Sequence, residues 1–192
     1  MLTRRHALWA APLAVVAAGV GASGWMLLRR PERASGIGGP FTLVDGAGKT
    51  VTDAAFLGKW MLIYFGYTHC PDACPTALQD MANALDMLDP AQRKDVAIVF
   101  ITVDPERDTP VVMREYVSNF NAPIVALSGS AEQIAAAAKA YRVYYAKHPT
   151  TDGYEMDHSS VIYVMNPDGD FVTNFTHETP PARIAEKLRS LV

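Results

Sequence analysis

Two cysteines in one short turn constrain this chain more than any other feature of its sequence. Cys70 and Cys74 are its only cysteines among 192 residues. Residues 60–65 before them form an apolar run typical of a buried strand, and residues 76–88 after them repeat apolar side chains at helical spacing. The sequence therefore places both thiols in a strand-to-helix turn. With Asp72 as the N-cap, we expect Cys74 in the first helical turn, where the helix dipole favours a thiolate.

Three uses of a Cys-x-x-x-Cys pair are open on these residues alone. A structural disulfide would close a very small loop and remove little entropy from the unfolded chain. Redox catalysis is the second use, although the thioredoxin family spaces its thiols Cys-x-x-Cys, one residue closer. Metal binding is the third, since thiolates one helical turn apart suit Cu(I) and also accept Zn(II). A metal would need a further ligand from elsewhere in the chain.

Residues 1–30 differ from the rest of the chain. Residues 7–28 carry no charge, and arginines flank them on both sides. Roughly 20 apolar residues are enough to span a bilayer, so we predict an uncleaved membrane anchor, with a cleaved signal peptide as the alternative. Residues 31–39 contain three glycines and are interpreted as a linker. Residues 40–192 then form one folded domain.

The charge of the domain excludes one class of partner. The whole chain has a net charge of −3, and residues 1–33 hold five basic residues and one acidic residue, so residues 34–192 carry −7. An acidic domain without basic clusters argues against nucleic acid as a partner. It also disfavours adsorption to anionic lipid, so we expect membrane attachment only through the N-terminal segment.

The order of predicted elements indicates an α/β fold. A hairpin over residues 41–52 precedes the cysteine turn, and continuous apolar runs predict further buried strands at 96–103, 124–127 and 161–165. Thr109 and Ser130 are predicted N-caps of two helices, and Pro180 opens a last amphipathic helix. Residues 143–147 look extended, and residues 148–157 are interpreted as a polar loop. The pattern predicts a thioredoxin-like, peroxiredoxin-like fold with a central mixed sheet flanked by helices.

Three separated motifs make the chain resemble the Sco/SenC family of membrane-anchored copper proteins, over nearly all of residues 38–192. They are residues 65–75 (Phe-Gly-Tyr-Thr-His-Cys-Pro-Asp-Ala-Cys-Pro), residues 103–109 (Val-Asp-Pro-Glu-Arg-Asp-Thr) and residues 157–159 (Asp-His-Ser). The resemblance implies a copper site formed by Cys70, Cys74 and His158. Such a ligand set suits Cu(I), and it can also hold Cu(II) because imidazole suits the oxidised ion. Zinc would fit the same ligands.

Other candidate side chains receive more modest predictions. His69 adjoins Cys70 and is a candidate hydrogen-bond partner of the site, whereas His148 and His177 are expected in solvent. Met156, a soft ligand type near His158, is expected to pack instead. Residues Asp104, Arg107 and Asp108 are interpreted either as a solvated turn with a local ion pair or, from the resemblance, as support for the site or a partner-docking surface.

The resemblance implies a copper metallochaperone. Its recipient would be the dinuclear copper centre in subunit II of cytochrome c oxidase, and a separate protein would donate the copper. The expected location is a bacterial inner membrane, with one membrane pass and the domain in the periplasm. The alternative is a thiol-disulfide oxidoreductase that reduces the cysteines of that subunit through Cys70 and Cys74. A thiol peroxidase fits less well, because Tyr67 replaces the threonine of the Thr-x-x-Cys peroxidase motif.

Overall fold

A computed structural model describes residues 36–192 of the chain. The predicted anchor over residues 1–30 lies outside the described residues, as does most of the predicted linker. Among the helices within residues 36–192, none has the length and apolar character needed to cross a membrane. The end of the predicted linker is bound to the domain: the Gly38 N–H donates to the Ala140 carbonyl at 2.9 Å, and Arg142 Nε donates to the Gly36 carbonyl at 2.9 Å.

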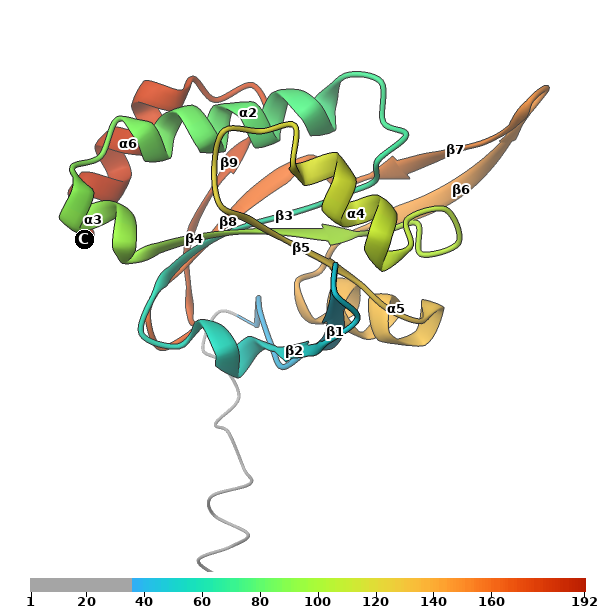
Figure 1. Cartoon of the computed structure of the whole chain (residues 1–192), viewed down its shortest axis with the longest axis horizontal. Helices are drawn as coiled ribbons and strands as arrows, with labels where there is room; N and C mark the ends of the chain where they lie inside the picture. The colour runs from blue at the N-terminus through green and yellow to red at the C-terminus, as the bar shows by residue number, and fades with distance from the viewer. Residues whose placement is uncertain (1–35) are drawn as a thin grey trace, which may run out of the picture. The chain divides into compact units, whose positions relative to one another are not determined.

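A seven-stranded mixed sheet forms the centre of the domain (Figure 1), in the order β2-β1-β5-β4-β3-β8-β9. Its middle strands β3, β4 and β5 run parallel, whereas β1, β8 and β9 pair antiparallel with their neighbours. The mixed sheet predicted from the sequence is confirmed. The strands are β1 Thr42–Asp45, β2 Thr50–Thr52, β3 Trp60–Gly66, β4 Val96–Thr102, β5 Ile124–Ser128, β8 Val161–Met165 and β9 Phe171–Thr176.

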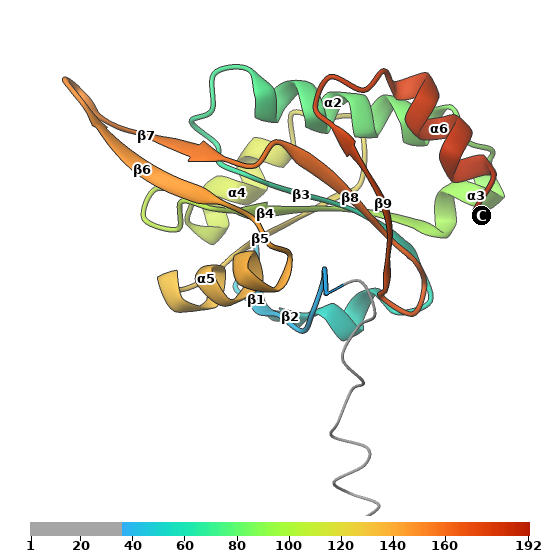
Figure 2. The same ribbon diagram turned by 180° about the vertical axis from the view of Figure 1, so that it is seen from behind.

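Helices cover both faces of this sheet. Figures 1 and 2 show α2 and α6 side by side on one face and α5 on the opposite face, while α4 packs on β5. The predicted caps are confirmed at Thr109, which accepts the Val112 N–H, and at Ser130, which forms a capping box with Gln133. The helices are α2 Ala73–Asp86, α3 Pro90–Lys94, α4 Pro110–Val117, α5 Ala131–Ala140 and α6 Pro181–Arg189, with a short 3₁₀ helix, η1, at Asp53–Phe56.

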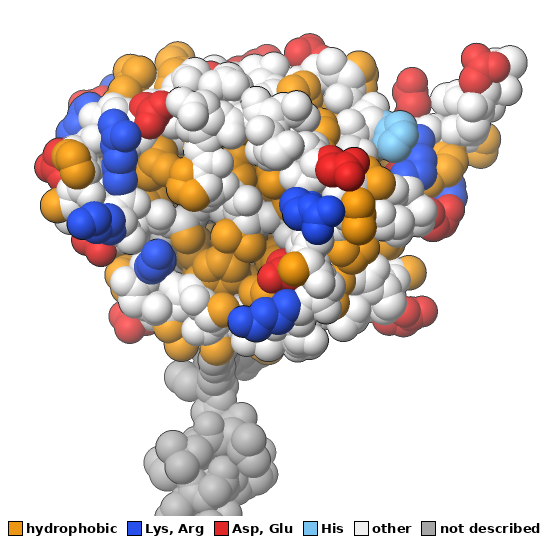
Figure 3. All heavy atoms as spheres, in the orientation of Figure 1, with side chains coloured by type: hydrophobic (Ala, Val, Ile, Leu, Met, Phe, Trp, Pro, Cys, Tyr) orange, Lys and Arg blue, Asp and Glu red, His pale blue; other side chains and the backbone are white. Residues whose placement is uncertain are grey.

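The polar segment predicted as a loop is instead a β-hairpin, and this prediction was wrong. Strands β6 (Tyr145–Thr150) and β7 (Gly153–His158) pair antiparallel as a separate two-stranded sheet. Gly153 at the turn has a φ of +140°, a conformation that side-chain-bearing residues rarely adopt. Figure 3 shows the hairpin projecting from the body as a narrow arm. The sequence signal was present, because the dipeptide Asp-Gly is a strong hairpin turn and apolar or aromatic residues alternate after it.

Candidate metal centre

The cysteine turn joins the buried strand β3 to helix α2, as the sequence predicts. Strand β3 ends at Gly66, and Cys74 is the second residue of α2. A Cβ atom added at Gly66 would lie 2.6 Å from the Cys74 sulfur and 3.0 Å from the Phe100 ring. Only a glycine therefore leaves room for the Cys74 side chain to sit on the end of the strand.

The two thiols have different environments. Cys74 is fully buried, whereas Cys70 is half-buried, and neither forms a disulfide. The Cys74 N–H donates to the Cys70 sulfur at 3.4 Å. The hydrogen bond from the Cys74 thiol lowers the pKa of Cys70 well below its ordinary value, although burial opposes the shift. That same hydrogen bond, together with burial, raises the pKa of Cys74.

The thiolate is therefore expected at Cys70 and not at Cys74. The prediction of a thiolate at Cys74 was wrong, because the first turn of α2 gives its N–H to Cys70 while Cys74 itself is enclosed by apolar side chains. Asp72 does occupy the N-cap position of α2, but its carboxylate accepts no N–H from the first turn. The N-terminus of α2 thus stabilises the negative charge of a Cys70 thiolate, which lies just before the helix.

His158, the last residue of β7, completes the cluster. Its Nε2 lies 3.4 Å from the Cys74 sulfur, and its Nδ1 lies 3.3 Å from the Ser159 carbonyl oxygen. A carbonyl can only accept, so Nδ1 carries the proton and the lone pair of Nε2 faces the thiols. The rings of Tyr64 and Tyr67 stand edge-on to the imidazole, with centroids 5.9 and 5.8 Å away. These two rings restrict how the imidazole can turn.

These three side chains form a group that can bind one metal ion. One ligand atom from each of Cys70, Cys74 and His158 lies within 4.8 Å of the others. The donor set, two sulfurs and one imidazole nitrogen, fits copper, and the group borders solvent on the side of the half-buried Cys70. The three-residue ligand set that the resemblance implied is thus brought together, although its members come from distant parts of the chain.

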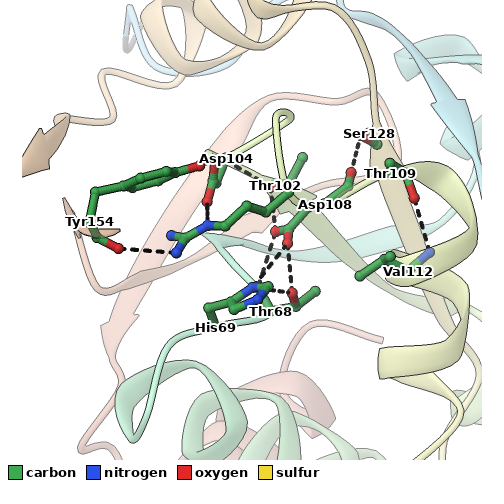
Figure 4. Close-up of polar contacts among 10 residues, drawn as sticks. Thr68, His69, Thr102, Asp104, Asp108, Thr109, Val112, Ser128 and Tyr154 are labelled. Atoms are coloured by element: carbon green, nitrogen blue, oxygen red, sulfur yellow. Dashed lines mark hydrogen bonds and ion pairs between the residues drawn. The ribbon is translucent and has the colours of Figure 1, made fainter. Parts of the chain in front are cut away.

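A second cluster of polar residues forms hydrogen bonds with the cysteine turn and supports it (Figure 4). The buried Asp108 carboxylate accepts hydrogen bonds from the Thr68 N–H at 3.0 Å, the Thr68 hydroxyl at 2.6 Å and the Thr102 hydroxyl at 2.7 Å. Asp108 is fully buried and Asp104 is only 3% exposed. The interpretation of this segment as a solvated turn was therefore wrong, because the loop after β4 folds against the loop after its parallel neighbour β3.

Within residues 36–192, the other histidines lie outside the metal-binding group. His69 is exposed, and its Nδ1 lies 3.1 Å from the Thr68 hydroxyl and 3.9 Å from Asp108. His148 is paired with Asp157 at 2.9 Å on the exposed hairpin. Met156 is 8% exposed and packs in the hydrophobic core, as the sequence predicts.

Sequence reasoning missed several residues that shape this site. Gly66 was predicted only as a member of the cysteine motif, and it makes room for Cys74. Tyr64 and Tyr154 were predicted only as parts of a strand and a loop, yet they contact His158 and bind Asp104, respectively. The sequence did contain a signal for the polar residues that support the cysteine turn. The loop rich in Asp and Arg follows β4, whose carboxyl end lies beside that of β3, so its side chains had to approach the cysteine turn.

Comparison with known families agrees with this geometry. The family model described as SCO1/SenC matches residues 29–192. The chain belongs to the SCO1/SenC family. The computed structure also superposes on Bradyrhizobium japonicum ScoI with copper bound, with a TM-score of 0.75 and 46% identity, over 81% of this chain and 99% of that one.

Two other relatives bear on the interpretation. The mitochondrial SCO1 homolog 1 of Arabidopsis thaliana is 48% identical over 137 residues, which are 71% of this SCO1/SenC chain and 41% of the relative. This chain thus spans less than half of that protein's length. BsSco, a member of the Sco family of cytochrome c oxidase assembly proteins in which a disulfide switch was identified, superposes with a TM-score of 0.66 and 27% identity, over 85% of this chain and 96% of that one.

Proposed function

We propose that this protein is a copper metallochaperone that binds one copper ion through Cys70, Cys74 and His158. The observation that carries the proposal is the convergence of these two sulfurs and one imidazole nitrogen within 4.8 Å. Copper-bound relatives of the same fold, with 46% identity in one case, support the choice of metal. Zinc would accept the same donors, so the choice rests on the family as well as on the ligands.

The asymmetry of the thiols suits transfer of the ion as well as binding. Cys74 and the buried rings around it form the closed side of the site, whereas Cys70 is half-buried beside solvent. A ligand from a receiving protein would therefore approach on the Cys70 side, where the group borders solvent. Both cysteines must be reduced, because a disulfide leaves no thiolate to bind the ion.

The proposed recipient is the dinuclear copper centre in subunit II of cytochrome c oxidase. Support comes from the relative BsSco, which belongs to a family of cytochrome c oxidase assembly proteins. The uncharged stretch at residues 7–28 supports a single-pass anchor in a bacterial inner membrane, with the domain in the periplasm and a separate protein supplying copper there. These assignments belong to the proposal.

A thiol-disulfide oxidoreductase is the second candidate, and the cysteine pair itself favours it. Cys70 has a lowered pKa and is accessible, while the protonated Cys74 lies beside it, which is the arrangement of an attacking and a resolving thiol. The substrate would be a disulfide in the same oxidase subunit. His158 separates the two functions, because copper retention needs the imidazole and disulfide exchange does not.

The experiment is copper binding by the reduced full chain in mild detergent. Stoichiometry and the Cu(II)–thiolate absorption of the wild type are compared with His158→Ala and with His148→Ala, a histidine on the same hairpin outside the site. One copper per wild-type chain, retained by His148→Ala and lost or much weakened in His158→Ala, supports the metallochaperone. Absence of copper from the wild type, or equal binding by His158→Ala, rejects it and leaves the oxidoreductase as the better explanation.

A further inference from the structure

The arm that carries His158 has little structure of its own. Strands β6 and β7 form a separate two-stranded sheet, and residues 147–153 around its turn are all exposed. A two-stranded hairpin is at best marginally stable by itself in water. The position of His158, at the end of β7, therefore depends on contacts between the hairpin and the body of the domain.

One face of β7 makes those contacts. Tyr154, Met156 and His158 alternate with the exposed residues Glu155 and Asp157, so they share the face turned to the body. Met156 is buried, but a hollow of 220 Å³ extends beneath it, between β6, α5 and the loop after β4. Apolar packing under the hairpin is thus incomplete, and Tyr154 adds a polar attachment on this face.

Tyr154 is held by Asp104 and Arg107 of the loop after β4. The guanidinium carbon of Arg107 lies 3.8 Å from the centroid of the Tyr154 ring, and Nη1 donates to the Tyr154 carbonyl at 3.0 Å. The Tyr154 hydroxyl donates to Asp104 at 2.9 Å, and Arg107 Nε is ion-paired with the same carboxylate. Figure 4 shows the Tyr154 side chain lying beside Asp104.

The same guanidinium also reaches the cysteine turn. Its central carbon lies 5.7 Å from the ring centroid of Tyr67, which is three residues before Cys70. The Tyr67 ring in turn stands at 88° to the His158 imidazole, 5.8 Å away. Arg107 therefore lies between an aromatic ring of the hairpin and an aromatic ring of the cysteine turn, the two segments that must meet at the site.

We propose that Arg107 is the positioning residue for His158: by clamping Tyr154 against the domain and packing on Tyr67, it holds the imidazole opposite the two cysteines. The proposal deepens the proposed function and rests on it for the effect on copper, but the placement of the imidazole is a property of the metal-free protein. Without the clamp, His158 moves away from the thiols and the ion keeps two ligands.

A second polar link between hairpin and body, an exposed ion pair, does not explain the placement equally well. Lys147 Nζ lies 2.6 Å from Glu106, but both side chains are exposed, at 43% and 68%. Exposed ion pairs hold two long side chains weakly. Arg107, by contrast, is 25% exposed and its partner Asp104 is 3% exposed. The buried pair is therefore the one that defines the position of β7.

The test uses Arg107→Met in the reduced full chain, with Arg93→Met as the matched control. Arg93 also binds a carboxylate, Asp86, and a backbone carbonyl, Leu88, but neither belongs to the hairpin or the cysteine turn. The first readout, in the absence of metal, is the nuclear Overhauser effect between the rings of His158 and Tyr67. The second is Cu(I) affinity, measured against a competing chelator.

We expect Arg107→Met to lose the ring-to-ring signal and to bind copper about 10- to 100-fold more weakly, the usual effect of losing a residue that orients a ligand. Arg93→Met keeps both properties. Arg107→Lys keeps the ion pair with Asp104 but lacks the planar face for stacking, so it restores affinity only in part. Tyr154→Leu reproduces the effect of Arg107→Met from the hairpin side, which covers the case that Arg107→Met does not fold.

An Arg107→Met or Tyr154→Leu protein that folds and keeps the His158–Tyr67 signal would overturn the proposal. Equal losses in Arg93→Met would do the same, because they would show a general effect of removing an arginine. If the wild type binds no copper, the proposed function fails, yet the ring-to-ring signal still decides whether Arg107 positions His158. The two failures are therefore distinguishable.

Discussion

The cysteine turn and the β6–β7 hairpin bring ligands to one site from contrasting surroundings. Cys74 is fully buried, and the loop before it is bonded to the buried Asp108. The hairpin that ends in His158 is exposed over residues 147–153 and is attached through few side chains. Two ligands are therefore fixed by the core, while the third lies on an arm whose position is set locally. Substitutions in the first region should change the stability of the whole domain, and those in the second should change mainly the site.

The largest expected effect is on the support of the cysteine turn. Asp108→Ala leaves two hydroxyls and one N–H without their buried acceptor, at about 1–3 kcal/mol each, so we expect the free energy of unfolding to fall by about 3 kcal/mol or more. Urea unfolding measures the change. Asp157→Ala on the hairpin removes an exposed carboxylate that pairs with His148. It should lower the free energy of unfolding by no more than about 0.5 kcal/mol. Similar losses in the two variants would contradict the contrast between the regions.

Two glycine-to-alanine substitutions, one in each region, compare the effect of core packing with the effect of backbone strain. Gly66→Ala forces a Cβ to within 2.6 Å of the Cys74 sulfur, and such overpacking of a core costs about 1–3 kcal/mol. Gly153→Ala, at the hairpin turn, meets no atom within 4 Å and suffers only from its positive φ. We expect Gly66→Ala to lower the unfolding midpoint and weaken metal binding together, whereas Gly153→Ala loosens the hairpin with a smaller change in the midpoint. A Gly66→Ala protein with an unchanged unfolding midpoint and unchanged metal binding would show that the Cys74 side chain has room to move.

Alkylation of the reduced protein sharpens the comparison within the cysteine turn itself. The pKa of Cys70 is lowered and that of Cys74 is raised, so the thiolate is on the accessible sulfur. An ordinary thiol loses reactivity roughly tenfold per pH unit below its pKa, whereas a thiol with a lowered pKa stays ionised from about pH 8 to pH 6. We expect iodoacetamide to modify Cys70 first, with a rate nearly independent of pH in this range, as mass spectrometry of peptides would show. Preferential labelling of Cys74 would contradict both the burial and the pKa directions.

The smallest expected effect is at the exposed end of the arm. Lys147→Met removes the ion pair with Glu106, and exposed pairs contribute only about 0–1 kcal/mol. We expect copper affinity to stay within the error of measurement and the unfolding midpoint to move little. A strong loss of copper in Lys147→Met would mean that the outer ion pair, and not Arg107, controls the arm.

The sequence predicts the cysteine turn far better than the hairpin, for physical reasons. Strand β3 and helix α2 have strong periodic patterns, so the location of Cys70 and Cys74 follows from local residues. Strand β6 contains Lys147, His148 and a proline, and its last four residues are exposed, so it has no apolar pattern to detect. The ionisation of the thiols also escaped local reasoning, because it depends on the hydrogen bond between the two thiols and on their unequal burial, both of which the fold sets.

The polar residues that support the cysteine turn show the same limit of prediction from local sequence. A loop with four charged residues in the five positions 104–108 is most simply interpreted as solvated, yet Asp104 and Asp108 are among the few buried acids of the described residues. Their partners, Thr68 and Tyr154, come from elements 40 and 50 residues away along the chain. Only the parallel pairing of β3 and β4, once known, makes these contacts foreseeable.

The separation of the ligands along the chain has a thermodynamic consequence. Cys74 and His158 are 84 residues apart, so an unfolded chain cannot present both to the same ion without closing a long loop. An ion held by all three side chains thus binds the native state more tightly than the unfolded chain, which keeps only the two cysteines close together. Mass action then stabilises the native state by up to about 2.7 kcal/mol when the free ion is at 100 times its dissociation constant. The thermal transition of the domain therefore measures how much of the protein carries its metal.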